Sequence, residues 1–89
     1  MSQTYRRNGR VEMAPMKDET VLFNPANNKF CVLNATAAFI WGYLDRPRTH
    51  SEIATAVAGH FSGVDTALAS RDAEKVIADL CNIDCVVPE

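Results

Sequence analysis

A change of periodicity at Asn34 constrains the fold of this 89-residue chain more than any other feature. Before Asn34, apolar and β-branched residues come in short runs that Pro, Asn and charged residues separate. After Asn34, apolar residues recur at spacings of three and four positions, which is the pattern of amphipathic helices. The sequence therefore predicts a domain whose first half is a sheet and whose second half is helical.

The first half contains three candidate strands, Val11–Ala14, Thr20–Asn24 and Lys29–Leu33. Turn residues at 15–19 and 24–28 separate them, and Asn and Pro are typical of such turns. Pro cannot donate to a central ladder, so Pro25 favours a turn. This order predicts a three-stranded antiparallel meander in which Lys29–Leu33 is the last strand.

Capping residues mark the start of three predicted helices. Asn34 is a good N-cap for the first, Thr49 and Glu52 form a capping-box pattern before the second, and Asp65 precedes the third. The third helix is the longest and spans Thr66–Asn82. We expect the following apolar residues of the three helices to be buried: Ala37, Ile40, Trp41, Leu44; Ile53, Ala54, Val57, Phe61; Ala69, Ala73, Val76, Ile77, Leu80, Ile83.

The order of elements predicts an α+β fold that is winged-helix-like, with a three-stranded antiparallel sheet followed by three helices. A short extended segment, Cys85–Val87, returns to the body after the third helix. The first ten residues carry no periodicity, so residues 1–10 are expected to form a flexible N-terminal tail. Residues 11–89 are expected to form one domain.

The distribution of charge argues against nucleic-acid binding. The formal net charge is −2, and Arg6, Arg7 and Arg10 provide three of the nine basic side chains. From residue 11 onward there are six basic and eleven acidic side chains, so the predicted body is acidic and suits phosphate backbones poorly. No apolar run is long enough to span a membrane, and the N-terminus lacks the apolar region of a secretory signal. We therefore expect a cytoplasmic protein that contacts neither membrane nor nucleic acid.

The sequence offers no pattern typical of catalysis or metal binding. Cys31, Cys81 and Cys85 are an odd number of cysteines without a second matched pair, and His50 and His60 lie apart from any paired carboxylate and nucleophile. No glycine-rich phosphate loop is present. We interpret the cysteines as free thiols in a reducing compartment, and we expect no enzyme activity, no metal site and no cofactor.

Several segments resemble the PqqD-like family, named after the pyrroloquinoline-quinone biosynthesis protein D. The resemblance is carried by Leu33–Trp41, by Leu44–Thr49 with Glu52-Ile53 behind it, and by Arg71-Asp72 with the later Leu80. It covers about Val11 to Val87. The chain departs from the family pattern at Ala37 and at Asp84-Cys85-Val86, where glycine is common. Asp tolerates the left-handed conformation of a helix C-cap, so Asp84 is compatible with the same helix end.

The resemblance implies a non-catalytic recognition element that binds the leader segment of a ribosomally made precursor peptide. The family adds the leader as a strand to the third strand of the sheet, beside the third helix. Such adaptors present the leader to a modifying enzyme, for example a radical-SAM enzyme, a cyclase or a leader peptidase. On this chain the implied peptide-binding residues are Lys29, Phe30, Cys31, Val32, Leu33, Arg71, Asp72, Lys75, Val76 and Asp79.

The residues alone leave other interpretations open. The strand Lys29–Leu33 could be a covered edge or an ordinary core strand. The charged residues of the third helix could form a solvated helix face: Arg71, Asp72, Lys75 and Asp79. A winged helix that binds DNA is the main alternative, with the third helix as reader. A thiol-redox protein that uses Cys81 and Cys85 is a weaker one. An exposed strand edge could also pair between copies, so both a monomer and a dimer fit the sequence.

Overall fold

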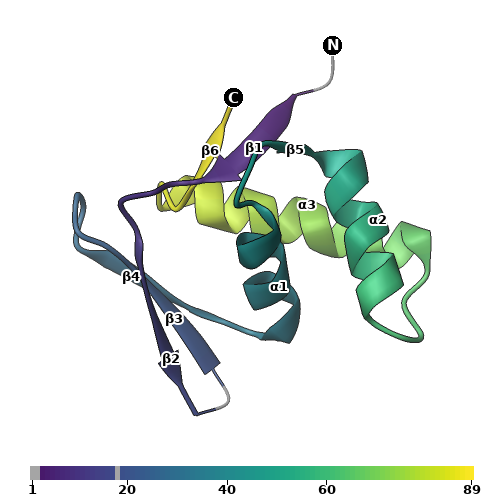
Figure 1. Cartoon of the computed structure of the whole chain (residues 1–89), viewed down its shortest axis with the longest axis horizontal. Helices are drawn as coiled ribbons and strands as arrows, with labels where there is room; N and C mark the ends of the chain where they lie inside the picture. Colours follow the sequence, from purple (N-terminus) through teal and green to yellow (C-terminus); the bar gives the residue numbers. More distant parts are fainter. Residues whose placement is uncertain (1–2, 18) are drawn as a thin grey trace.

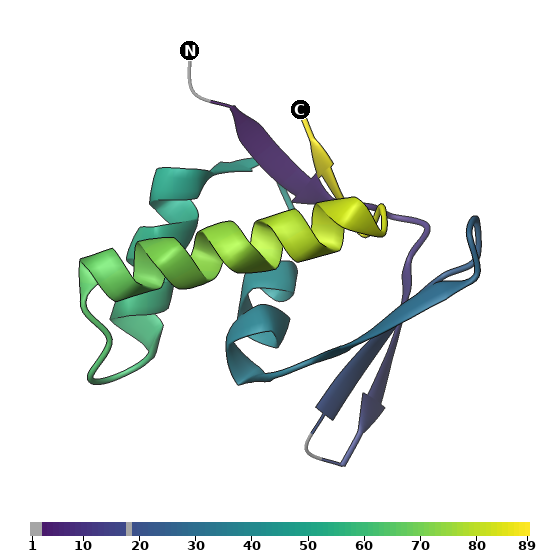
Figure 2. The same cartoon turned by 180° about the vertical axis from the view of Figure 1, so that it is seen from behind.

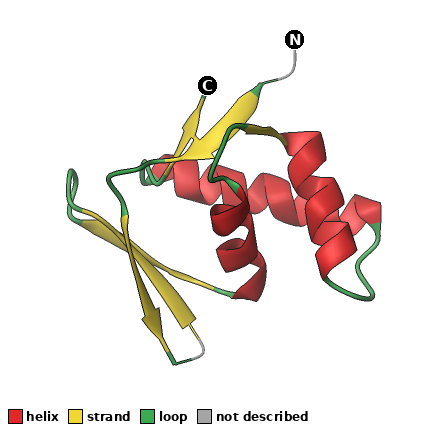
Figure 3. Ribbon diagram, in the orientation of Figure 1, coloured by secondary structure: helices red, strands yellow, loops and turns green. Residues whose placement is uncertain are grey.

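The computed structural model describes residues 3–17 and 19–89 and contains two small sheets beside three helices (Figures 1 and 3). The Cα radius of gyration is 12.5 Å. The elements follow in the order β1 (Thr4–Arg7), β2 (Glu12–Met16), β3 (Glu19–Asn24), β4 (Lys29–Leu33), α1 (Ala35–Tyr43), β5 (Arg48–Thr49), α2 (His50–His60), α3 (Thr66–Asn82) and β6 (Val86–Pro88).

The predicted meander is present as the antiparallel sheet β2-β3-β4. The bounds of β4 are those predicted, whereas β2 extends to Met16 instead of ending at Ala14. Pro15 therefore lies inside a strand, and β2 can hold it because it is an edge strand of this sheet. Position 18 of the predicted turn lies outside the described residues.

The three helices begin at the predicted caps. The side chains of Asn34 and Asp65 accept hydrogen bonds from backbone amides in the first turns of α1 and α3. Thr49 and Glu52 form a reciprocal capping box, with distances of 2.8 and 3.1 Å. In Figure 2, α3 crosses in front of α1 and α2. Asp84 adopts a φ of 58° just after α3, which is the left-handed conformation expected there.

The expectation of a tail without structure is wrong for residues 4–7. These residues form β1, the central strand of a second sheet with the order β5-β1-β6. Thr4 pairs with Thr49 on one side, and Arg7 pairs with Val86 on the other. Tertiary pairing explains the difference, because each partner lies more than forty positions away and leaves no local periodicity. The first two residues of the predicted tail lie outside the described residues.

The N-terminal strand also closes over the core. The amide of Arg7 donates to the carbonyl of Leu44 at 3.0 Å, and the guanidinium of Arg7 lies 5.0 Å from the centre of the Trp41 ring. Arg6 forms an ion pair with Glu89 at 3.0 Å. Two of the three N-terminal arginines are therefore held in place by the folded body.

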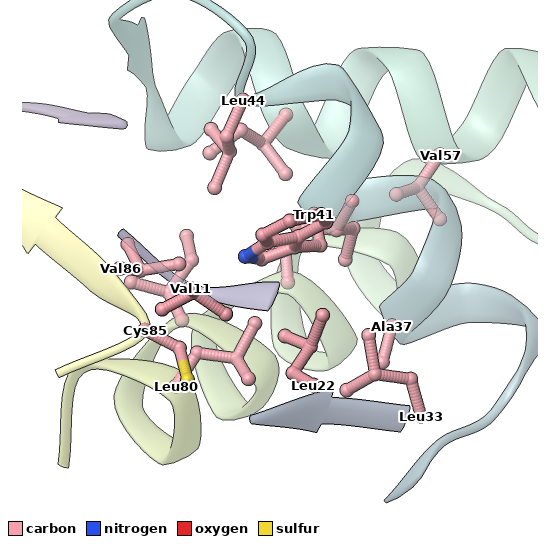
Figure 4. Close-up of a cluster of buried hydrophobic side chains, with 14 of the residues drawn as sticks. Val11, Leu22, Leu33, Ala37, Trp41, Leu44, Val57, Leu80, Cys85 and Val86 are labelled. Atoms are coloured by element: carbon pink, nitrogen blue, oxygen red, sulfur yellow. The ribbon is translucent and has the colours of Figure 1, made fainter. Parts of the chain in front are cut away.

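The core lies between the helices and joins both sheets to them (Figure 4). Trp41 is 5% exposed, and Figure 4 places its ring between Val57 on one side and Val86, Val11 and Leu80 on the other. The predicted helical stripes are mostly buried. Phe61, Val76 and Ile83 are only partly buried and pack against the core from its margin.

Candidate functional site

Strand β4 is an edge strand with one unpaired side among the described residues. It pairs with β3 along its whole length, from Asn24 opposite Lys29 to Thr20 opposite Leu33. Its other side has no partner strand in residues 3–17 and 19–89. Backbone amides and carbonyls on this side are therefore available to a further strand.

The pairing of β2 with β3 determines which residues of β4 point outward. Hydrogen-bonded and non-bonded pairs alternate along an antiparallel ladder. Pro15 has no N–H and lies opposite Thr20, so this pair belongs to the non-bonded set. The N–H and C=O of Thr20 then point to the other neighbour, β4, where Thr20 lies opposite Leu33.

The turn between β3 and β4 gives the same result. The carbonyl of Asn24 accepts a hydrogen bond from Asn27 in this turn, so it points toward the β4 side of β3. Lys29, Cys31 and Leu33 consequently bond to β3. We infer that Phe30 and Val32 direct their amides and carbonyls away from the sheet, toward the open edge.

A groove of about 290 Å³ runs beside this edge, between β4, the start of α1 and α3. Its lining includes apolar side chains such as Val76, two carboxylates and one ammonium group. The groove is lined by Cys31, Val32, Leu33, Asn34, Thr36, Ala37, Asp72, Lys75, Val76, Asp79 and Leu80.

Seven of the ten residues that the resemblance implied line this groove. Lys29, Phe30 and Arg71 do not, and all three are exposed. Sequence reasoning missed Asn34, Thr36, Ala37 and Leu80 as groove residues. The sequence pattern predicts Asn34 only as a helix cap and Ala37 and Leu80 only as core residues, because periodicity does not show that a core residue also borders a groove.

The charged groups of the groove are free to meet a ligand. Asp72, Lys75 and Asp79 lie at i, i+3 and i+7 on α3. Among the described residues the ion pairs join Arg6 to Glu89 and Arg48 to Asp45, so none involves these three side chains. Two carboxylates against one ammonium group make the groove acidic.

Burial raises the pKa of all three thiols. The pKa of Cys31 is raised first by burial and further by the carboxylate of Asp79 across the groove. Burial, with smaller contributions from Cys31 and Asp84, raises the pKa of Cys85 to about 11. The pKa of Cys81 is raised by burial and by Asp84. At neutral pH these thiols are protonated, which is unsuitable for a nucleophile or a redox pair.

A second hollow of about 460 Å³ lies on the opposite side of α3. It is lined by Tyr5, His50, Glu74, Ile77, Ala78 and Cys81. Although it is larger, the nearby β1 is paired on both sides. This hollow therefore lacks an open strand edge, and the groove beside β4 is the better candidate for binding an extended chain.

The histidines have structural partners. His50 Nε2 lies 3.0 Å from the carbonyl of Ser70, and the ring of His60 stacks on Phe39 with centroids 4.2 Å apart. No group of three or more His, Cys, Asp or Glu side chains in residues 3–17 and 19–89 could hold a metal ion. None of the helices described is long and apolar enough to cross a membrane.

An open strand edge beside a helix-lined groove is the architecture of a domain that binds an extended peptide by adding it to its sheet. Comparison with known families supports this class. The family model of coenzyme PQQ synthesis protein D (PqqD) matches residues 19–86. The chain belongs to this family, as its sequence pattern indicated.

Solved structures with the same fold include two in which the protein is in complex with a leader peptide. TbiB1 in complex with the TbiA(beta) leader peptide is 26% identical, with a TM-score of 0.76 over 91% of this chain and 93% of that chain. A lasso peptide synthetase B1 complexed with its leader peptide is 21% identical, with a TM-score of 0.77 over 94% of this chain and 98% of the other. Comparison with curated protein sequences gave no significant match.

Proposed function

We propose that this protein is a leader-peptide recognition element that binds a ribosomally made precursor peptide along β4. The observation that carries the proposal is the open edge at Phe30 and Val32 beside the groove of α3. Membership of the PqqD family and the leader peptides bound to two proteins of this fold support it.

The backbone of β4 supplies affinity that does not depend on the sequence of the leader. Phe30 and Val32 together offer two amide donors and two carbonyl acceptors to an added strand. Because these groups are solvated in the free protein, each hydrogen bond contributes only about 1 kcal/mol net. Side chains in the groove must therefore provide most of the selectivity.

The groove suits a peptide that combines apolar and basic side chains. Val76, which is partly exposed, can cover an apolar side chain, while Asp72 and Asp79 stand where a cation would be favourable. Lys75 opposes an additional positive charge and favours a carboxylate near it. The groove would therefore select leaders by the positions of the charged residues along the bound segment.

In this proposal the protein is an adaptor without catalytic chemistry of its own. It holds the leader while a separate enzyme, such as a radical-SAM enzyme, a cyclase or a leader peptidase, acts on the rest of the precursor. The protonated thiols, the partnered histidines and the absence of a metal-ligand cluster among the described residues fit this role.

Proline substitutions test the strand addition. Val32→Pro removes an outward donor and places a ring at the open edge, so it should weaken binding while the β3–β4 ladder remains. Met13→Pro is the matched control, because Met13 lies two positions before Pro15 on the opposite edge strand and therefore also directs its amide outward. Cys31→Pro removes an inward donor and should damage the sheet itself.

The measurement is fluorescence anisotropy with a labelled leader from the precursor peptide encoded nearest to the gene of this chain. Circular dichroism confirms the fold of each variant. We expect Met13→Pro to bind as the wild type does and Val32→Pro to lose at least tenfold in affinity. Full affinity of a folded Val32→Pro variant would exclude strand addition at this edge.

The DNA-binding alternative is not favoured by the charges of α3. Its solvent-accessible positions include Asp72, Glu74 and Asp79 beside Arg71 and Lys75. A recognition helix that approaches phosphates is expected to be cationic. A duplex titration at two salt concentrations checks this, and we expect no binding that falls steeply with added salt.

A further inference from the structure

The face of sheet β2-β3-β4 that points away from the core is unusually apolar. Phe30 is 69% exposed and Val32 is 53% exposed. Side chains alternate between the two faces of a strand, so these two residues share one face, opposite that of the buried Leu33. Their cross-strand partners on this outer face are Phe23 and Val21, which are only partly buried.

Glu12 and Glu19 also lie on this outer face, but its residues toward β4 are apolar where a solvated antiparallel sheet is normally polar. Met16 on β2 extends the apolar surface and is 60% exposed. The largest apolar area lies at the β4 edge, at Phe30 and Val32. The outer face is therefore continuous with the edge to which the leader is proposed to add.

The same two residues, Phe30 and Val32, supply both the open backbone groups and the exposed apolar side chains. A strand that pairs with these backbone groups must place every second side chain on the outer face, directly beside Phe30 and Val32. The side chains between them point to the opposite face, where the groove of α3 lies. The side chains of the bound peptide would therefore contact the protein on both faces of the added strand.

We propose that the recognised segment of the leader is apolar on both faces of its strand. Two residues at positions i and i+2 cover Phe30 and Val32 on the outer face, and the residue between them enters the groove at Val76. The sequence signature of the bound segment is three consecutive apolar residues. Recognition on one face alone would select alternating apolar and polar residues instead. This inference rests on the proposed strand addition.

A selection from a random dodecapeptide display library tests the signature without knowledge of the natural precursor. The library is selected in parallel on the wild type, on the double variant Phe30→Thr/Val32→Thr, and on Met16→Thr. Thr preserves β-propensity and removes most of the apolar surface. Met16→Thr is the matched control, because Met16 lies on the same outer face but on the strand at the opposite edge.

We expect the wild type and Met16→Thr to enrich peptides with three consecutive apolar residues. The double variant should retain the central apolar position and lose the constraint on both flanking positions. In enriched peptides, Thr at either flanking position should weaken binding to the wild type by about fivefold, the upper range for a cross-strand pair. The same change should have little effect on binding to the double variant.

Each other outcome overturns the inference. If the double variant selects the same three-residue signature, the outer face does not contact the peptide. If sedimentation shows a wild-type dimer that Phe30→Thr dissociates, a second copy covers this face instead. If the wild type enriches no peptide, or if Val32→Pro enriches the same peptides, the proposed function fails and this inference fails with it.

Discussion

At the scale of single residues, neighbours in β4 serve different purposes. Cys31 contributes its backbone to the sheet and its side chain to the groove, while Val32 contributes its backbone to the open edge. The sequence predicted the strand and most groove residues, because family pattern and helix periodicity both indicate them. It could not assign the direction of each amide, since this depends on the partner of Pro15 and on the carbonyl of Asn24.

Alkylation of the three cysteines distinguishes the groove from the second hollow. Cys31 lines the groove, Cys81 lines the hollow on the other side of α3, and Cys85 is fully buried. Raised pKa values make all three slow to react at pH 7, and reaction should accelerate as pH rises toward 9 and thiolate forms. Cys85, with a pKa of about 11, should remain unmodified at pH 9.

A bound leader should protect only Cys31 from iodoacetamide at pH 9. Mass spectrometry of peptic fragments measures modification of each cysteine with and without the leader. Cys81 serves as an internal control in the same molecule, because its surroundings do not include β4. Equal protection of Cys31 and Cys81 would indicate a global effect of the peptide instead of binding in the groove.

Trp41 is the largest side chain in the core, and its truncation should have a large effect. Trp41→Ala should lower the free energy of unfolding by about 3–5 kcal/mol, since the cavity adds to the lost burial. Phe30→Ala is the control: Phe30 is 69% exposed, so its change should stay within about 0.5 kcal/mol. Urea unfolding measures both, and similar midpoints for the two variants would contradict the described core.

At the scale of elements, local signals and long-range pairing differ in what a sequence reveals. The three helices, their caps and β4 were predicted because capping residues and periodicity are local. The extended segment Cys85–Val87 was predicted and overlaps β6 (Val86–Pro88). Its pairing with β1 and the strands β1 and β5 were missed, because these strands are short and pair with distant parts of the chain. The sequence predicts that Arg6 and Arg7 belong to a basic tail, whereas in β1 both side chains contact the folded body.

Deleting residues 1–9 should therefore destabilise the protein. The deletion removes β1, the backbone hydrogen bonds of Arg7 to Leu44 and of Asn8 to Cys85, and the cation–π contact of Arg7 with Trp41. We expect a loss of at least about 2 kcal/mol, because each of these interactions contributes about 1 kcal/mol. For a domain of this size the melting temperature should fall by roughly 10 °C.

Differential scanning calorimetry of the deletion variant provides the measurement. Arg10→Ala is the control directly after the deleted segment, because Arg10 is exposed and lies outside β1. Its melting temperature should match that of the wild type. A deletion variant that melts like the wild type would show that β1 contributes nothing to stability and that residues 1–9 behave as the tail the sequence suggested.

At the scale of the whole molecule, the arrangement of charge matters more than its total. The formal net charge is only −2. The N-terminal arginines Arg6 and Arg7 contact Glu89 and Trp41. The groove beside β4 contains two carboxylates and one ammonium group, that of Lys75. A leader that approaches the groove therefore meets an acidic surface, and a basic leader should associate faster than an acidic one.

Charge reversal at two sites distinguishes the effect of charge in the groove from the effect of the protein's net charge on the association rate of the leader. Lys75→Glu and Arg46→Glu change the net charge of the protein equally, but Lys75 lines the groove and Arg46 lies after the far end of α1. Stopped-flow association of the wild type and both variants at low salt, with a basic and an acidic version of the same leader, gives six rate constants. Lys75→Glu should widen the preference for the basic version by about tenfold, and Arg46→Glu should change it little.

Added salt provides the internal check, because the effect of Lys75→Glu should shrink as the screening length falls from about 10 Å at 0.1 M to about 3 Å at 1 M. The fold should tolerate both reversals, since Lys75 and Arg46 are exposed. If the two variants shift the preference equally, net charge steers the peptide. If neither does, the peptide does not pass the carboxylates of α3, and selectivity lies in the apolar contacts of β4 alone.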